Sequence, residues 1–299
     1  MERPDERISQ RDIEAIVAAL RQEPDGESLA RRLRDAVGSH AAVRAQRTLE
    51  IRLLGEFAIR VGDRWEPGPP PMRGRYLIQY LAVHRTGVTP RERLAEAIWP
   101  ELDGETAAHR VHIAVSGARA YLRRAVGGAD AIRCVRSGYG WAPGITVVTD
   151  VEAFLDAARG ESSEELLRAK QLYGGELLVS DAAEWIEPLR VRCAAAYVGI
   201  LERLAENALS YGEFGQALAF GLELVAFDRG HEGASRLVMR CFAALGRRGR
   251  ALAEYEALRA HLRKHLGLEP APETRQLIRA VVGQAEPDAI SQTPRAFKA

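Results

Sequence analysis

The chain has 299 residues, enough for about two domains, and its 46% hydrophobic, 28% charged and 6% aromatic residues are typical of a globular protein. Its 42 basic and 41 acidic residues leave a net charge of +1, which by itself favours neither nucleic acid nor a membrane as a partner. Three cysteines (Cys134, Cys193 and Cys241) are too few for a disulfide scaffold, and neither a secretory leader nor a membrane-length apolar run is found, so we expect a cytoplasmic protein.

Residues 1–46 are expected to form a helical extension. Apolar side chains recur at helical spacing around 13–20 and 29–37, and Pro24 and Gly26 separate the two stretches. Each stripe is too small to be stable alone, so we expect the extension to pack on the rest of the protein or on a partner.

The segment 47–145 is predicted to be a winged-helix domain with an N-terminal antiparallel sheet. Alternating apolar residues indicate three short strands, helical spacing indicates three helices, and Asp103 is suited to cap the last helix. A hairpin with a turn at Ser137 and Gly138 follows. The expected elements are strands at 49–53, 57–61 and 64–66, helices at 73–86, 90–98 and 104–126, and hairpin strands at 132–135 and 139–141.

Beyond Pro143 the chain is predicted to be helical, beginning with Asp150 as an N-cap. The stretch 211–218 matches 245–252 at a distance of 34 residues, which is the tetratricopeptide period, and small residues are expected where helices approach closely. Two helical hairpins that share glycine-rich turns by coincidence are the alternative. The predicted fold class is therefore α+β, mainly α, with a tetratricopeptide-like domain at 150–283 and a disordered tail at 284–299.

The charges are distributed unevenly between these segments. Residues 47–145 contain 15 arginines and 10 acids, whereas 150–282 contain 17 basic and 20 acidic residues. A basic domain is therefore joined to a mildly acidic one. Arginine suits phosphate and guanine because its planar fork donates parallel hydrogen bonds, although an arginine-rich composition without a target is also compatible with these numbers.

The helix at 104–126 has an unusual outward face. Val111, Val115, Ala118, Leu122 and Val126 define its buried stripe. The opposite face has no acid from Thr106 onward. It consists of mostly small residues with His109 and Ile113, flanked by arginines, as expected for a helix that enters the DNA major groove. The alternative is that this face packs on another domain. The residues predicted to contact DNA on this helix are Thr106, His109, Arg110, Ile113, Ser116 and Arg123.

Two further places offer arginines to DNA. Arg133 and Arg136 lie near the hairpin turn, with Ser137 at the turn itself, where a wing reaches phosphates or the minor groove. Arg73 and Arg75 lie near a helix N-terminus, which favours phosphate. The alternatives are a purely structural hairpin, with its aromatic residues in the core, and an ordinary surface role for the second pair.

Nothing in the sequence indicates catalysis. The seven histidines are scattered, and His109 and His112 lack nearby residues that would complete a metal site. We expect neither an enzyme nor a cofactor.

Taken together, these features resemble the Streptomyces antibiotic regulatory proteins, activators that join an OmpR-type winged helix to a tetratricopeptide-like bacterial transcriptional activator domain. The resemblance covers about 48–283. It rests on the stretches Ile51–Gly55, Arg73–Leu77, Arg93–Pro100, Val115-Ser116 with Leu122–Arg124, Ser137–Tyr139 and Leu266–Glu273.

This resemblance implies how the protein acts. The 104–126 helix would read the major groove of promoter direct repeats, the wing would touch the minor groove, and two copies would bind side by side as a homodimer and recruit RNA polymerase. The loop that faces polymerase corresponds to Glu101, Leu102 and Asp103, whereas Trp99 is expected in the core. The alternative function is a protein-binding scaffold whose winged helix does not bind DNA.

Overall fold

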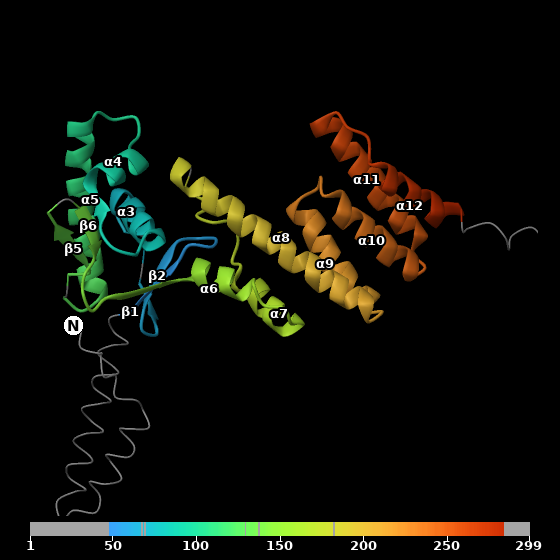
Figure 1. The fold of residues 1–299 in the computed structure, drawn as a ribbon, viewed down its shortest axis with the longest axis horizontal. Coiled ribbons are helices and arrows are strands. Elements are labelled where there is room, and N and C mark those ends of the chain that lie inside the picture. The colour runs from blue at the N-terminus through green and yellow to red at the C-terminus, as the bar shows by residue number, and fades with distance from the viewer. Residues whose placement is uncertain are drawn as a thin grey trace, which may run out of the picture. The chain divides into compact units, whose positions relative to one another are not determined.

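The computed structural model describes residues 48–283 except 67, 69, 129, 137 and 182. The chain divides into two units between Thr149 and Asp150, and each is described by itself (Figure 1). The helices expected within 1–46, the tail expected at 284–299 and Ser137 lie outside the described residues. The predicted fold class is confirmed, because small sheets and three helices precede an all-helical unit.

The first sheet of the N-terminal unit contains four strands in the order β3-β2-β1-β7. The meander of the first three was predicted, and it pairs antiparallel, with Ile51 opposite Ile59. Alternation places Leu49 and Ile51 in the core, where both are almost completely buried. The strands are β1 (Thr48–Arg52), β2 (Ala58–Val61), β3 (Arg64–Trp65) and β7 (Thr146–Thr149).

Strand β7 contradicts the prediction that everything beyond Pro143 is helical. It pairs parallel with β1, so that Thr48 lies opposite Thr146. Its four residues, Thr-Val-Val-Thr, are all β-branched and suit a strand. The pairing partner is almost one hundred residues away in the sequence, and a pattern of so few residues does not reveal such a contact.

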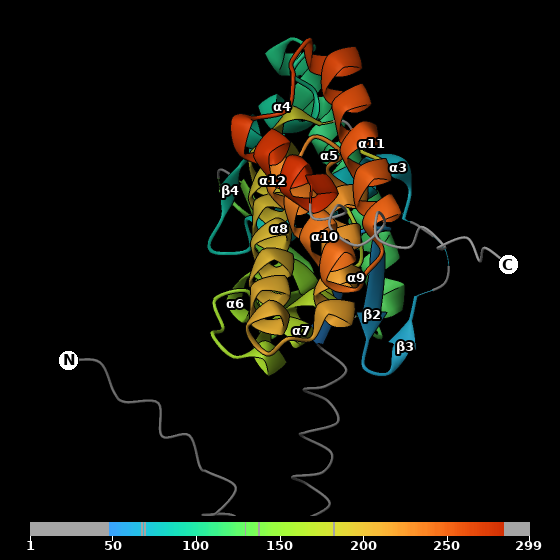
Figure 2. The same ribbon diagram turned by 90° about the vertical axis from the view of Figure 1, so that its right-hand side faces the viewer.

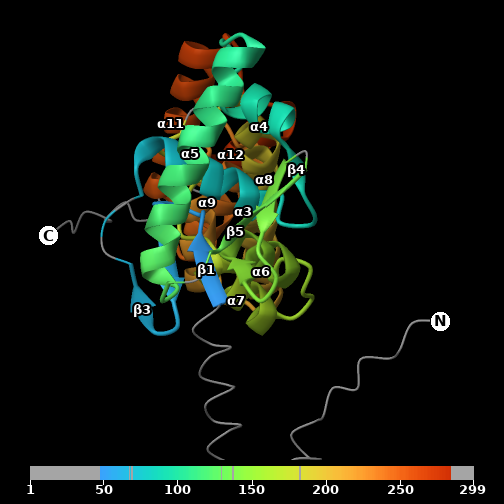
Figure 3. The same ribbon diagram turned by 90° about the vertical axis from the view of Figure 1, so that its left-hand side faces the viewer.

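Three helices follow the meander at the predicted places: α3 (Met72–Val83), α4 (Arg91–Ile98) and α5 (Gly104–Ala125). Asp103 caps α5 as predicted, since its Oδ1 accepts a hydrogen bond of 2.9 Å from the Thr106 backbone N–H. The predicted stripe from Val111 to Val126 is buried. Helices α3 and α5 pack side by side (Figures 1 and 3).

The hairpin belongs to a second sheet with the order β4-β6-β5. Its strands are β4 (Thr89–Pro90), β5 (Ile132–Val135) and β6 (Gly138–Trp141). Pro90 was expected in the first turn of a helix. It is instead the N-cap of α4, and Thr89 and Pro90 also pair with Tyr139 and Gly138. A side chain at Gly138 would collide with the backbone carbonyl of Thr89, so glycine permits this contact.

The C-terminal unit is all-helical. Helices α8 to α11 pack against one another in chain order (Figures 1 and 2). Asp150 is the first residue of α6 and not the N-cap expected from the sequence. The elements are α6 (Asp150–Ala157), α7 (Ser163–Leu172), η1 (Glu184–Ile186), α8 (Glu187–Ser210), α9 (Phe214–Phe227), α10 (Glu232–Ala244), α11 (Arg248–Leu266) and α12 (Pro272–Gly283).

The 34-residue repeat is visible in the turns between paired helices. Gly212 and Gly246 both adopt the left-handed conformation, with φ of +73° and +72°. Small residues were expected at close helix contacts in this repeat. Ala217 and Ala251 are fully buried, as this requires, whereas a Cβ at Gly215 or Gly249 would contact nothing. The close approach occurs at Gly221, where a Cβ would meet the side chains of α10.

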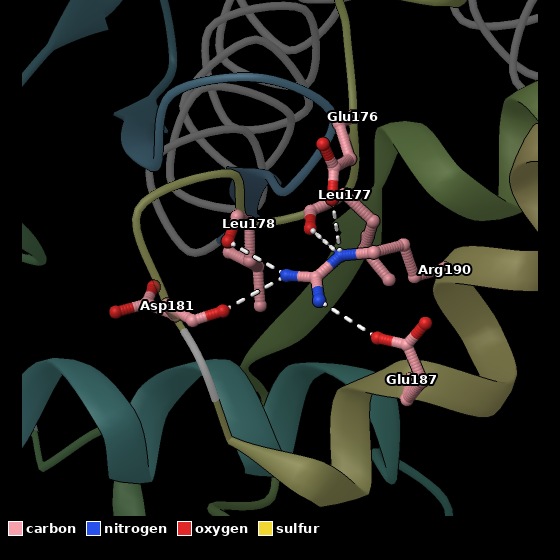
Figure 4. Close-up of polar contacts among 6 residues, drawn as sticks. All are labelled: Glu176, Leu177, Leu178, Asp181, Glu187 and Arg190. Carbon is pink, nitrogen blue, oxygen red and sulfur yellow. Dashed lines mark hydrogen bonds and ion pairs between the residues drawn. The ribbon is translucent and has the colours of Figure 1, made fainter. Parts of the chain in front are cut away.

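Arg190 connects α8 to the irregular segment that precedes it (Figure 4). Its guanidinium donates to the backbone carbonyl oxygens of Leu177 (3.1 Å), Leu178 (3.2 Å) and Asp181 (2.8 Å). It also forms ion pairs with Glu176 and Glu187 at 2.8 and 2.9 Å, and only 16% of its side chain is exposed. Leu178 has a positive φ of 49°, a conformation that needs such external support.

We therefore predict that Arg190→Ala lowers the free energy of unfolding by about 2–4 kcal/mol, because it leaves three carbonyls and two carboxylates without their cation. Arg190→Lys should recover only part of the loss, since an ammonium cannot reproduce the planar fork. Urea unfolding of the full chain, followed by circular dichroism, measures both effects. The matched control is Arg192→Ala, an exposed arginine on the same helix. Equal stability of the two alanine variants would contradict this role.

Candidate nucleic-acid interface

The outward face of α5 is open to solvent. Thr106, His109, Ile113 and Ser116 are exposed, with 42% exposure at Ile113, whereas Arg110 is half-buried. The predicted face therefore exists as one surface along the helix. It has no carboxylate from Thr106 to the end of α5. Such a surface presents donors, an imidazole and an aliphatic group without a charge that would repel phosphate.

Contacts on the opposite side hold α5 in place. A Cβ at Gly74 would lie 3.0 Å from the Ala118 backbone nitrogen, so the first turn of α3 touches the middle of α5 closely. Arg119 donates from Nε to the carbonyl oxygen of Ile132 at 3.0 Å, which joins α5 to β5. Sequence reasoning did not identify Arg119. Its place beside the buried stripe was the only available signal, because its partner comes from another element.

The close packing at Gly74 also places Arg73 and Arg75 beside α5. Both belong to the first turn of α3, which contains no acid. Arg73 is exposed, and Arg75 is half-buried with its guanidinium 5.5 Å from the centre of the Tyr76 ring. The backbone of this arginine pair is thus adjacent to Gly117 and Ala118.

The wing combines an exposed basic strand with a buried anchoring strand. Arg133 and Arg136 are exposed on and just after β5. Tyr139 and Trp141 of β6 are buried, and the Trp141 indole N–H donates to the Leu81 carbonyl oxygen at 2.9 Å. The expected structural role of the aromatic pair is confirmed, and it coexists with outward arginines.

Arg123 differs from the other arginines of the predicted site. Its Nε donates to Asp130 Oδ1 at 3.1 Å, and this bond lowers the pKa of the Asp130 carboxyl. Both side chains are more than half exposed, so the pair is weak and its partner exchangeable. The prediction of Arg123 as a DNA contact did not take this acid into account.

The loop between α4 and α5 contains the residues expected to face polymerase. Glu101 and Asp103 are exposed, Leu102 is half-buried, and Trp99 is buried in the core as predicted. The Thr106 N–H bond lowers the pKa of Asp103, so this acid is engaged in capping. Trp99 and Leu102 also line a cleft of about 330 Å³ between α4 and α5.

The described part of the chain shows neither a metal site nor a membrane-spanning helix. No group of three or more histidines, cysteines and acids there is suited to hold a metal ion. No described helix has the length and apolar character needed to span a membrane.

Comparisons with known proteins agree with this architecture. Residues 148–282 match the family described as bacterial transcriptional activator domain. Among solved structures, the chain is similar to Mycobacterium tuberculosis EmbR in complex with a low-affinity phosphopeptide, at 22% identity and a TM-score of 0.61. The similarity covers 80% of this chain but only 66% of the EmbR chain, and it shows a shared fold. No curated protein matches this chain.

The Asp103 cap leads to a prediction about pH. Asp103→Ala should destabilise the N-terminal unit, whereas Asp103→Asn should retain the cap, because an amide oxygen also accepts from Thr106 N–H. Because the folded pKa of Asp103 is depressed, its stabilisation is complete above the ordinary value of about 3.9 and is lost as the pH falls through the lower folded value. Thermal unfolding from neutral to acidic pH measures this. An Asn variant that loses stability with falling pH as steeply as the natural chain would contradict the assignment.

Proposed function

We propose that this chain is a SARP-like transcriptional activator, and that it activates transcription by binding specific DNA through its winged helix. Its residues 148–282 match the bacterial transcriptional activator domain. The family match of residues 148–282 and the fold shared with EmbR support this proposal. The observation that carries the proposal is the exposed, acid-free face of α5.

In this proposal α5 enters the major groove, which is wide enough to admit a helix. Ile113 is suited to contact a thymine methyl group. Thr106, His109 and Ser116 are suited to base edges or phosphates, and Arg110 has the planar donor pair that recognises guanine. Direct reading of bases thus depends on one side of about three helical turns.

The remaining arginines position the protein on the sugar-phosphate backbone. Arg73 and Arg75 combine their charge with the N-terminus of α3, an arrangement that favours phosphate. Arg133 and Arg136 lie where the wing would meet phosphates or a narrow minor groove. Ser137, at the wing turn in the sequence, and Arg123 complete the proposed set, the latter by exchanging Asp130 for a phosphate.

Activation requires a second surface that DNA leaves free. The α4–α5 loop supplies one, with Glu101 as the exposed acid that does not cap α5. We assign Glu101, Leu102 and Asp103 to contact with RNA polymerase, and two copies of the chain to adjacent direct repeats as a homodimer on DNA.

A protein-interaction scaffold is the second candidate. It is favoured by the packed hairpins of α8 to α11, because repeat helices commonly form binding surfaces. DNA binding distinguishes the two candidates, because in a scaffold α5 and the wing would not bind DNA.

The proposal predicts that Arg110→Ala and Arg136→Ala each weaken binding to a DNA site selected from a random pool. The expected loss is about 1–3 kcal/mol where the contact is to a base or a narrow groove, or about 5- to 150-fold in Kd. Mobility shift with purified full chain measures it.

The matched control is Arg64→Ala, which removes an exposed arginine of β3 that is paired with Glu66 and belongs to no proposed contact. Circular dichroism verifies that every variant is folded. If the Arg110 and Arg136 variants bind the selected site as tightly as the Arg64 variant, these two residues do not belong to the interface.

A further inference from the structure

The helical unit contains a groove whose two walls have opposite charge. Glu202 and Glu206 lie on α8, and Arg236 and Arg240 lie on α10. Each arginine follows its acidic counterpart by 34 residues, so the two repeats place opposite charges at equivalent positions. The side chains line a cleft of about 370 Å³ whose apolar surface comes from Leu209, Leu224, Leu237 and Leu277.

On each wall, one charged residue has a structural role: Glu202 on α8 and Arg236 on α10. His231 accepts from the Ala234 backbone N–H at Nδ1 (3.0 Å), so its proton is on Nε2, which lies 3.2 Å from the Glu202 carboxylate. Glu202 therefore fixes the tautomer in which His231 caps α10. On the opposite wall, Arg236 donates to the buried Thr274 hydroxyl at 3.1 Å, which attaches α10 to α12.

The second charged residue on each wall, Glu206 or Arg240, has no such structural role. Glu206 and Arg240 are both exposed, and within residues 48–283 as described neither forms a hydrogen bond or an ion pair. They do not neutralise each other across the groove. A ligand that fills the cleft would therefore meet a free carboxylate on one side, a free guanidinium on the other, and leucine side chains between them.

The length of the α8 wall favours a helical ligand. From Glu202 to Leu209 the wall extends over about 10 Å, or two helical turns. A helix that docks into a groove uses apolar anchors at i, i+3, i+4 and i+7 and places its edges against the two walls. Its charges must then be basic along the edge facing α8 and acidic along the edge facing α10.

We infer that this groove binds an amphipathic helix of a partner protein, with an apolar stripe between one basic edge and one acidic edge. The inference goes beyond the proposed function, because no residue of the groove belongs to the DNA interface. Charge complementarity provides specificity: a helix with two acidic edges is repelled by Glu206, and one with two basic edges is repelled by Arg240.

Three labelled synthetic helices of about 15 residues test this. All contain the same leucine stripe, and their edges are lysine with glutamate, glutamate on both sides, or lysine on both sides. In fluorescence anisotropy with the full chain, the mixed helix should bind most tightly. Glu206→Arg should weaken the mixed helix by about two- to fivefold and tighten the all-glutamate helix, while Arg240→Glu should tighten the all-lysine helix instead.

Arg192→Glu is the matched control, because it reverses an exposed charge on α8 outside the groove. It should leave the order of the three helices unchanged, and the groove variants should retain their affinity for DNA. The inference is overturned if no helix binds saturably, or if the charge reversals leave the preference unaltered. Displacement of the mixed helix by a peptide of residues 10–46 would assign the groove to the chain itself and refute a separate partner.

Discussion

The N-terminal unit depends on the close contact between the first turn of α3 and the middle of α5. Gly74 permits this contact, because a side chain there would press on the Ala118 backbone. The contact buries one side of α5 and leaves the acid-free side exposed, and it places the backbone of Arg73 and Arg75 next to Gly117 and Ala118. Arg119 and Trp141 then fix the wing against the same helices. One packing constraint therefore determines where the proposed DNA-binding groups lie.

Much of this fold was predictable because its signals are local. Helical spacing located α3, α4 and α5, and the Asp103 cap marked the start of α5. Strands β4 and β7 were not predicted, since each depends on a partner distant in the sequence, as Thr48 and Thr146 illustrate. Pro90 was expected in the first turn of α4, where proline is favoured, but it precedes that turn as the N-cap. In the repeat, the turn glycines were recognised, but the glycine at the closest helix contact, Gly221, was not.

The candidate site shows the same division. Rotation by 100° per residue correctly identified which side chains of α5 face outward, because that depends only on the buried stripe. The Arg123–Asp130 and Arg119–Ile132 contacts required the structure, since both partners follow α5 in the chain. Opposite charges at equivalent repeat positions were present in the sequence, but only the structure shows that α8 and α10 line one cleft with them.

A salt titration of DNA binding tests the central claim most directly. In mobility-shift measurements with the full chain and duplex DNA, the logarithm of the affinity should fall linearly with the logarithm of the salt concentration, because each phosphate contact releases counterions. Arg73→Ala should make the slope shallower by about one, without changing which sequence is preferred. A folded chain that binds no duplex at about 100 mM salt, or binds with a slope that no arginine of α3, α5 or the wing alters, would contradict the account.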